Sequence, residues 1–367
     1  MFRIHDHQRG LSLIELMIAM VLGLLIMTAI GSLFVASSRS HTELQKSAAQ
    51  IENGRYAIET ITEDLKHAGF YGRLAILPAL AGTQDPCETS STATLLAGIA
   101  LPVQAYRAAN YSSRPNISST SCGTLLTNAN LAPGSDVIAV RRGDTHTMAT
   151  TETATTDEVY IQANSFLADI RFGNGNTLAA NGGAANNATV PTVLNKDLTP
   201  ADVRKYEVHV YFVAPCSVAS GTSGKCATGD DSIPTLKRLE LKVDPSTGNR
   251  AMVIVPLVEG IDYLKAEWGI DDQPTTINVS TGLTGDGIVD SYVAAPSDAQ
   301  ISSAVAAKVF VLARNTEATS GHVDDKTYTL GTVAGTTTTA TNDAFKRHAF
   351  GNEVRFMNQG GRKEIPE

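Results

Sequence analysis

The chain is poor in the residues on which enzymes and nucleic-acid-binding proteins depend. Aromatic residues make up 6% and charged residues 18% of its 367 positions, while Gly, Ser, Thr, Asn and Ala are abundant. The net charge is −8, and Arg141–Arg142, which we expect on a solvated strand edge, is too small a basic cluster to bind phosphate. The composition therefore disfavours nucleic acid as a direct ligand and is typical of a loop-rich exported β domain.

Cysteine is also scarce: the chain has four, at Cys87, Cys122, Cys216 and Cys226. None stands in a C-x-x-C pair or has a spaced His partner, so we predict no metal site. In an exported protein an even number of cysteines predicts disulfides, and four cysteines allow three connectivities. We favour Cys216–Cys226 and Cys87–Cys122, because each pair closes a polar loop. Four free buried thiols are the alternative.

Catalytic motifs are missing as well. The chain has no G-x-S-x-G, no H-E-x-x-H and no G-x-G-x-x-G before a helix. Ser220–Cys226 resembles a phosphate-binding loop, but Ala219 and Cys226 replace its first Gly and its Ser/Thr, so we expect a disulfide-closed turn. The acids at 271–272 and 286–290 could bind calcium but lack the ligand alternation of an EF-hand loop, so we prefer a plain turn. We predict a non-catalytic protein without cofactor or metal.

What the chain does contain is a long apolar run near its N-terminus. Arg3 and Arg9 precede an apolar stretch from residue 11 to about 36, and no charged residue occurs from Leu16 to Ser38. At about 1.5 Å per residue, a helix of this length spans a hydrocarbon core of roughly 30 Å. The run is too long for an ordinary secretory signal. The basic residues before it predict a cytoplasmic N-terminus and an exported remainder.

One acidic residue interrupts the start of this run. An ionised Glu15 inside a bilayer costs a few kcal/mol. Cleavage between Gly10 and Leu11 would place Glu15 about 6 Å along the helix from a new α-amino group. Its carboxylate could then meet that charge on its own chain or on a neighbouring subunit, and Gly10 would leave a protease room to approach. Alternatively, Glu15 is a first-turn acid favoured by the helix dipole of an ordinary signal anchor.

The segment from Gly10 to Glu15, ahead of the apolar run, resembles the class III signal of type IV prepilins and type II secretion pseudopilins. The resemblance implies that a prepilin peptidase cuts after Gly10 and methylates Leu11, and that Glu15 registers subunits in a filament. Leu11 departs from the Phe usual in major pilins. Further stretches are similar to PilW-type minor pilins, patchily after the first helix: residues 55–72, 257–271 and 346–359.

Beyond the apolar run, the sequence predicts an amphipathic helix that ends at Ala68–Gly69. Its charged face includes Glu63 and Asp64, and its apolar stripe consists of Leu44, Ala48, Ile51, Ile58, Ile61 and Leu65. Period-two alternation then predicts half-buried strands at 136–141, 158–162, 206–212, 238–243, 252–257, 263–270, 308–313 and 353–357. His209 is expected to be a surface or pairing residue. Polar loops, expected to be exposed or mobile, occupy 173–188, 217–231, 275–287 and 329–342.

The predicted fold class is α+β and pilin-like, with a long N-terminal helix packed on an antiparallel β-sheet with long loops. We expect four segments: a cleaved basic leader at 1–10, a membrane-spanning assembly half-helix at 11–36, an amphipathic half-helix at 37–69 and an exported β-rich head at 70–367.

The resemblance implies a minor pilin that joins type IV pili and helps to prime their assembly, with family roles in twitching motility, adhesion and DNA uptake. Its partners would be other minor pilins, the major pilin, the inner-membrane assembly machinery, the prepilin peptidase and a tip adhesin. It would wait in the inner membrane with a periplasmic head, then enter the pilus at its tip. The alternatives are a type II secretion pseudopilin and a membrane-anchored periplasmic enzyme or binding protein.

Overall fold

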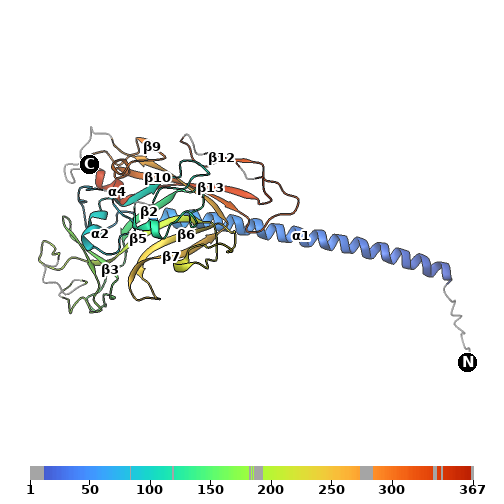
Figure 1. Cartoon of the computed structure of the whole chain (residues 1–367), viewed down its shortest axis with the longest axis horizontal. Coiled ribbons are helices and arrows are strands. Elements are labelled where there is room, and N and C mark those ends of the chain that lie inside the picture. The colour runs from blue at the N-terminus through green and yellow to red at the C-terminus, as the bar shows by residue number, and fades with distance from the viewer. Residues whose placement is uncertain are drawn as a thin grey trace, which may run out of the picture. The chain divides into compact units, whose positions relative to one another are not determined.

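The computed structural model describes residues 12–82, 84–117, 120–181, 183, 185, 193–272, 284–333, 337–339 and 342–364. By its internal contacts the chain divides into two units, Met1–Ala49 and Gln50–Glu367. The helices (Figure 1) are α1 (Leu13–Lys66), α2 (Thr92–Gly98), α3 (Asp298–Ile301) and α4 (Met357–Lys363), with short 3-10 turns η1 (Ser121–Thr124) and η2 (Thr222–Gly224). The strands are β1 (Val103–Tyr106), β2 (Val137–Gly143), β3 (Val159–Ala163), β4 (Ala168–Phe172), β5 (Val203–Ala214), β6 (Thr235–Val243), β7 (Arg250–Glu259), β8 (Ile261–Ile270), β9 (Ser291–Val293), β10 (Ala304–Arg314), β11 (Thr327–Thr329), β12 (Thr337–Thr339) and β13 (Arg347–Arg355).

Helix α1 ends where the sequence predicts, and for the predicted reason. Its last turn tightens through the bonds from His67 N to Asp64 O and from Ala68 N to Leu65 O. Gly69 follows with φ +72°, a left-handed conformation that glycine adopts without a Cβ penalty. Its N–H donates to Arg141 O at 3.0 Å, so the turn after the helix is fastened to β2.

The larger sheet is antiparallel and has seven strands. Its main path is β1-β2-β5-β3-β4, and β6 joins β5 and β7 joins β6. Strand β5 is its centre because it is long enough to pair with β2 over residues 206–211, β3 over 203–205 and β6 over 209–214. Its sequence is rich in β-branched and aromatic residues, which suit a strand buried on both faces.

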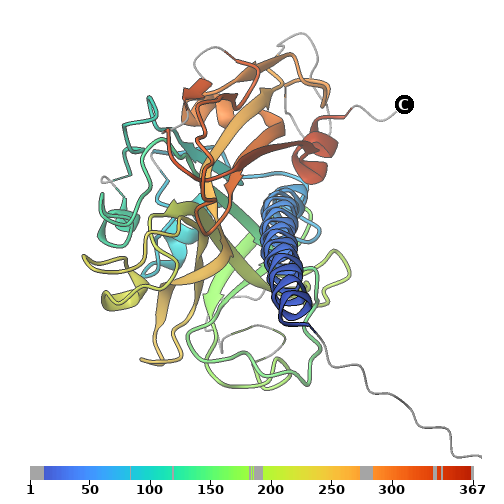
Figure 2. The same cartoon turned by 90° about the vertical axis from the view of Figure 1, so that its right-hand side faces the viewer.

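A second antiparallel sheet of four strands runs in the order β13-β10-β8-β9, and β11 and β12 form a separate pair. Helix α4 follows β13 and lies beside the end of α1 (Figure 2). Asn358 Nδ2 donates to Ala68 O at 3.3 Å, and an Arg362 amino group donates to Gly69 O at 2.8 Å. The last described residues therefore hold the turn at which α1 ends.

Two large apolar clusters lie on the two faces of the larger sheet. One gathers side chains from the second half of α1, one face of the larger sheet and the four-stranded sheet, including Ile61, Tyr211 and Trp268. The other lies under the opposite face of the larger sheet, where α2 and the Cys87–Cys122 region cover it. The pilin-like α+β fold class is confirmed, with two principal sheets instead of the single sheet expected.

The structure corrects several local predictions about the sheets. Strand β5 is buried along most of both faces, not half-buried, because α1 covers the face that the alternation marks as polar. Arg141 is 2% exposed and donates to Leu101 O, and β2 lies between β1 and β5, so the pair Arg141–Arg142 is not on a solvated edge. Residues 353–357 do not form one strand, because β13 ends at Arg355 and Met357 begins α4.

The predicted loops and helical stripe also need revision. Leu178 and Ala185, in the loop expected at 173–188, are buried in a small cluster with Tyr160. The loops expected at 275–287 and 329–342 fall partly outside the described residues. On α1, Leu44 is 64% and Ile51 45% exposed. The buried face instead includes Gln50 and Gly54, because Gln50 binds backbone carbonyls of the head and Gly54 leaves room for an aromatic ring.

Candidate functional site

The first candidate site is the beginning of α1, where Glu15 caps its own helix. One Glu15 carboxylate oxygen accepts from Ser12 N at 3.0 Å, and the Ser12 hydroxyl accepts from Ile14 N at 3.4 Å. This reciprocal arrangement resembles a capping box, in which side chains satisfy the unpaired N–H groups of the first turn. Gly10 and Leu11 lie outside the described residues, so cleavage and methylation there stay predictions. Glu15 thus contacts the backbone one residue beyond the proposed new terminus.

From Leu16 to about Ala36, α1 presents mainly apolar side chains all round. Among the described helices, α1 is the one whose length and apolar composition would allow it to cross a membrane. Its polar hydroxyls are satisfied internally: Thr28 donates to Leu25 O at 2.9 Å and Ser32 to Ala29 O at 2.8 Å. Such bonds reduce the cost of hydroxyl groups in hydrocarbon. The exposed large apolar residues of this segment include Leu13, Ile14, Met17, Leu24, Met27, Leu33 and Phe34.

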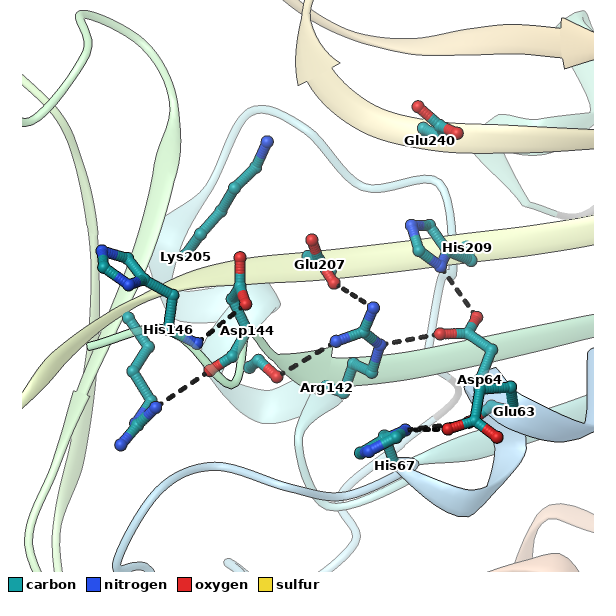
Figure 3. A network of polar contacts seen from close by, with 12 residues as sticks. Glu63, Asp64, His67, Arg142, Asp144, His146, Lys205, Glu207, His209 and Glu240 are labelled. Atoms are coloured by element: carbon teal, nitrogen blue, oxygen red, sulfur yellow. Dashed lines mark hydrogen bonds and ion pairs between the residues drawn. The ribbon is translucent and has the colours of Figure 1, made fainter. Parts of the chain in front are cut away.

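The second candidate site is a polar network that ties the end of α1 to the larger sheet (Figure 3). Asp64, on the last turns of α1, is 6% exposed. One of its oxygens accepts from Arg142 Nε at 2.7 Å; the other accepts from Tyr211 Oη at 3.0 Å and lies 2.7 Å from His209 Nδ1. Because a carboxylate only accepts, Nδ1 carries the proton in this contact. Arg142 extends the network to Glu207 at 2.6 Å.

These contacts decide the charge state of Asp64. Burial alone raises the pKa of its carboxyl, but the interactions with His209 and Arg142 outweigh burial and hold that pKa well below its usual range. Burial and the neighbouring Asp64 carboxylate raise the pKa of Tyr211 well above its ordinary value, so its hydroxyl stays a donor. The site holds a buried carboxylate in one orientation through groups of β2 and β5. Its chemistry is therefore that of a structural clamp.

Sequence reasoning missed this network. Asp64 was expected on the charged, solvated face of α1, whereas the structure buries it among Ile61 and Leu65. His209 is a pairing residue as expected, but a buried one, at 8% exposure. The available signal was the polar alternation in β5, where Glu207, His209 and Tyr211 share one face. The polar face of a strand predicts buried partners for charged helix residues only when the helix is known to pack on that face.

The cysteines form two disulfides, Cys87–Cys122 and Cys216–Cys226, the pairing favoured from the loop lengths. They lie 35 and 10 residues apart in the sequence and leave no free cysteine in the described chain. The second one closes the loop that carries η2, so the resemblance of Ser220–Cys226 to a phosphate loop reflects a covalently closed turn. Both bonds restrict the loops that cover the larger sheet.

The acidic residues considered for calcium hold a turn together. Asp271 accepts from Gly287 N at 2.8 Å, Asp290 accepts from Asp272 N at 3.1 Å, and Asp286 accepts from Ile288 N at 2.9 Å. Lys363 Nζ lies 3.4 Å from Asp271 and supplies a counter-charge. Within the described ranges no group of three or more His, Cys, Asp or Glu side chains could hold a metal ion.

Comparison with known proteins identifies two segments. Residues 211–358, from β5 into α4, match the family model described as type IV pilus-assembly protein W. Residues 5–31, which include Glu15, match the model of the prokaryotic N-terminal methylation motif. No curated protein and no solved structure matches the chain.

Proposed function

Because this chain belongs to the PilW family of type IV pilus-assembly proteins and carries a prepilin methylation motif, we propose that it is a minor pilin that helps to prime pilus assembly. The family is a structural one rather than an enzyme family. The prepilin motif and the apolar helix indicate a membrane location first and a pilus location afterwards. The finer steps, from cleavage to a place at the pilus tip, are part of the proposal.

The single observation that carries the proposal is the position of Glu15. It is the charged residue that precedes the uncharged stretch from Leu16 to Ser38, and its carboxylate already reaches the backbone of Ser12. Cleavage after Gly10 would create a positive amine at Leu11, next to that contact. In the membrane, the carboxylate can pair with its own terminus. In a helical bundle, the same carboxylate can exchange that partner for the amine of a neighbouring subunit.

The mechanism follows from these parts. The basic leader 1–10 holds the N-terminus in the cytoplasm until the prepilin peptidase removes it, and the head waits in the periplasm. The inner-membrane machinery then extracts the subunit, and the apolar surface of α1 moves from lipid into a bundle with other minor pilins and the major pilin. Gly23 and Gly31 suit this step, because small residues on a helix surface let neighbouring helices approach closely. The large, loop-rich head would not tile easily along a filament, which favours a rare position at the tip, where a tip adhesin could contact it.

Mass analysis and N-terminal sequencing of the mature protein from its native host test the processing step. We expect a chain that starts at Leu11 and carries one added methyl group. A protein that retains Met1, or one that starts near Ser37, would remove the basis of the proposal.

Gene deletion tests the pathway. We expect surface pili and twitching motility to be lost while protein secretion continues. Loss of secretion with normal pili would instead assign the chain to a type II secretion pseudopilus, and loss of neither would contradict both filament roles.

A further inference from the structure

The edges of the two principal sheets differ in how they are protected. Natural sheets guard their edge strands by keeping them short, by proline or bulges, or by covering them. Here β1 and β9 have four and three residues, and β4 has five and packs against α2. Strand β7 is long, but it contains Pro256, pairs across a register shift and packs against η2. Strand β13 has nine residues, no proline and no register shift against β10.

The free hydrogen-bonding groups of β13 follow from its register with β10. At one end Phe356 N donates to Val305 O at 2.8 Å, and at the other Asn315 N donates to Lys346 O at 3.1 Å. The register is continuous between these bonds, so even-numbered residues of β13 direct their backbone groups to β10. The odd-numbered residues Ala349, Gly351 and Glu353 therefore direct their N–H and C=O groups away from the sheet. The described residues place no strand on that side.

The side chains hold this edge in place. On the even-numbered face, Val354 is buried, and the ring of Phe350 packs where a Cβ on Gly54 of α1 would lie 2.1 Å from it. On the other face, Glu353 stands opposite Lys308 of β10 and accepts a hydrogen bond from Tyr292. The edge is therefore a regular, well-supported strand with solvent on its open side, not a frayed one.

A groove crosses the face of the sheet that carries Glu353 and Arg355 of β13, and its other walls come from β9, β10 and residues 286–290. It has a volume of about 950 Å³. Four acidic side chains and a single basic one line it: Asp286, Asp290, Glu353, Glu364 and Arg355. Arg355 already pairs with Glu364. Alternate side chains of a strand added to β13 would lie on this same face of the sheet, beside Glu353 at the margin of the groove, and the acidic excess favours Lys or Arg at those positions.

We propose that β13 is a docking edge, to which an extended, basic segment of a different pilus subunit adds as a further antiparallel or parallel strand. Main-chain bonds to Ala349, Gly351 and Glu353 would supply affinity, and the groove would select basic side chains. A second copy of this chain fits less well, because it would bring a second acidic groove against the first. The inference rests on the proposed function, since it names the kind of partner that a minor pilin would hold.

Site-specific cross-linking of the full chain in its native host tests the proposal. A photo-reactive amino acid replaces the exposed Asn352, whose own backbone groups face β10, and Leu198, 77% exposed elsewhere on the head, serves as the control position. We expect Asn352 to cross-link to an extended, basic segment of another pilus subunit, and Leu198 not to do so. A cross-link only to a second copy, or none in cells that assemble pili, would overturn the proposal.

Two substitutions refine the test. Ala349→Pro removes an outward N–H and no hydrogen bond to β10, and should lower the cross-link yield about tenfold, whereas Ala349→Ser, which keeps that N–H, should not. Glu353→Gln retains an acceptor for Tyr292 but removes charge, and should lower the yield about twofold to threefold, mostly at low salt. Yields are compared at equal levels of protease-resistant protein, so that misfolding is not counted. Equal yields from the Pro and Ser variants would contradict strand addition.

Gene deletion and cross-linking in the same host distinguish failure of this inference from failure of the proposed function. If deletion of the gene abolishes pili but Asn352 cross-links to no other subunit, the minor pilin role stands and the docking edge is wrong. If deletion leaves pili intact, the proposed function itself fails.

Discussion

Two of the carboxylates on helix α1 are in opposite situations. Glu15 lies exposed at the start of an apolar segment and accepts a hydrogen bond from Ser12 N in its own first turn. Asp64 lies at the other end of the helix, buried, with Arg142, His209 and Tyr211 around it. The head satisfies the Asp64 carboxylate with side chains far away in the sequence, whereas the Glu15 carboxylate meets a backbone group of its own helix. The proposed function gives Glu15 a partner on another subunit, so the two carboxylates should respond differently to substitution.

The largest effect should come from Asp64→Asn. The substitution keeps the shape of the side chain but removes the carboxylate that Arg142 and His209 share, so that Arg142 retains Glu207 whereas His209 loses its carboxylate partner; breaking a buried pair in this way costs about 3–5 kcal/mol. Denaturant unfolding of the full chain in detergent measures the loss. The matched control is the neighbouring exposed Glu63, whose change to Gln should alter the free energy of unfolding by less than about 0.5 kcal/mol. Equal losses of unfolding free energy in the two variants would contradict the structural role of Asp64.

Glu15→Ala should leave the fold unchanged and still impair assembly. We expect normal cleavage and a roughly hundredfold loss of incorporation into pili, which corresponds to a few kcal/mol for one uncompensated amine. Immunoblots of sheared pili and of membranes measure the ratio, and Glu15→Asp is the charge-retaining control. Normal incorporation of the Ala variant would show that Glu15 has no registering role.

Acid should weaken the head through Asp64. Since its pKa is lower folded than unfolded, its stabilising contribution is complete above the unfolded pKa of about 3.9 and declines as the pH falls toward the folded pKa. Between pH 7 and pH 3 this carboxyl alone should account for a loss of about 1 kcal/mol. Unfolding curves at both pH values, compared with Asp64→Asn, isolate the effect. If the difference in unfolding free energy between wild type and Asp64→Asn does not become smaller at pH 3, Asp64 is not the carboxyl that links stability to pH.

Two glycines of α1 provide the smallest test. At Gly54 a Cβ would lie 2.1 Å from the Phe350 ring, whereas at Gly31 nothing lies within 4 Å. Gly54→Ala should destabilise the head by about 0.5–1 kcal/mol, because overpacking is partly offset by the higher helix propensity of Ala. Gly31→Ala should not lower head stability. The same unfolding assay compares them, and a stabilised Gly54→Ala variant would show that the ring moves aside freely.

Much of the fold could be read from local patterns. The long helix and its end at Gly69 follow from apolar spacing and a glycine stop, and β2, β3, β5, β6, β7, β8 and β10 each overlap a predicted strand. The short strands β1, β4 and β9 were not predicted, because a segment of three to five residues shows little periodicity. Pairing with neighbouring strands supplies most of their stability. The partial burial of the polar loop at 173–188 was not predicted, because the few apolar residues that anchor it are scattered along the loop.

By itself, the sequence determined the processing motif, the membrane-length apolar helix and the placement of Glu15, because each depends on residues close together along the chain. Only the tertiary structure decided that Asp64 is buried, that Arg142 is its partner, and that β13 is left as an open edge. Those outcomes depend on which surfaces meet over long sequence separations. A charge pattern cannot show whether water or a buried counter-charge will face it, because that depends on the element packed opposite.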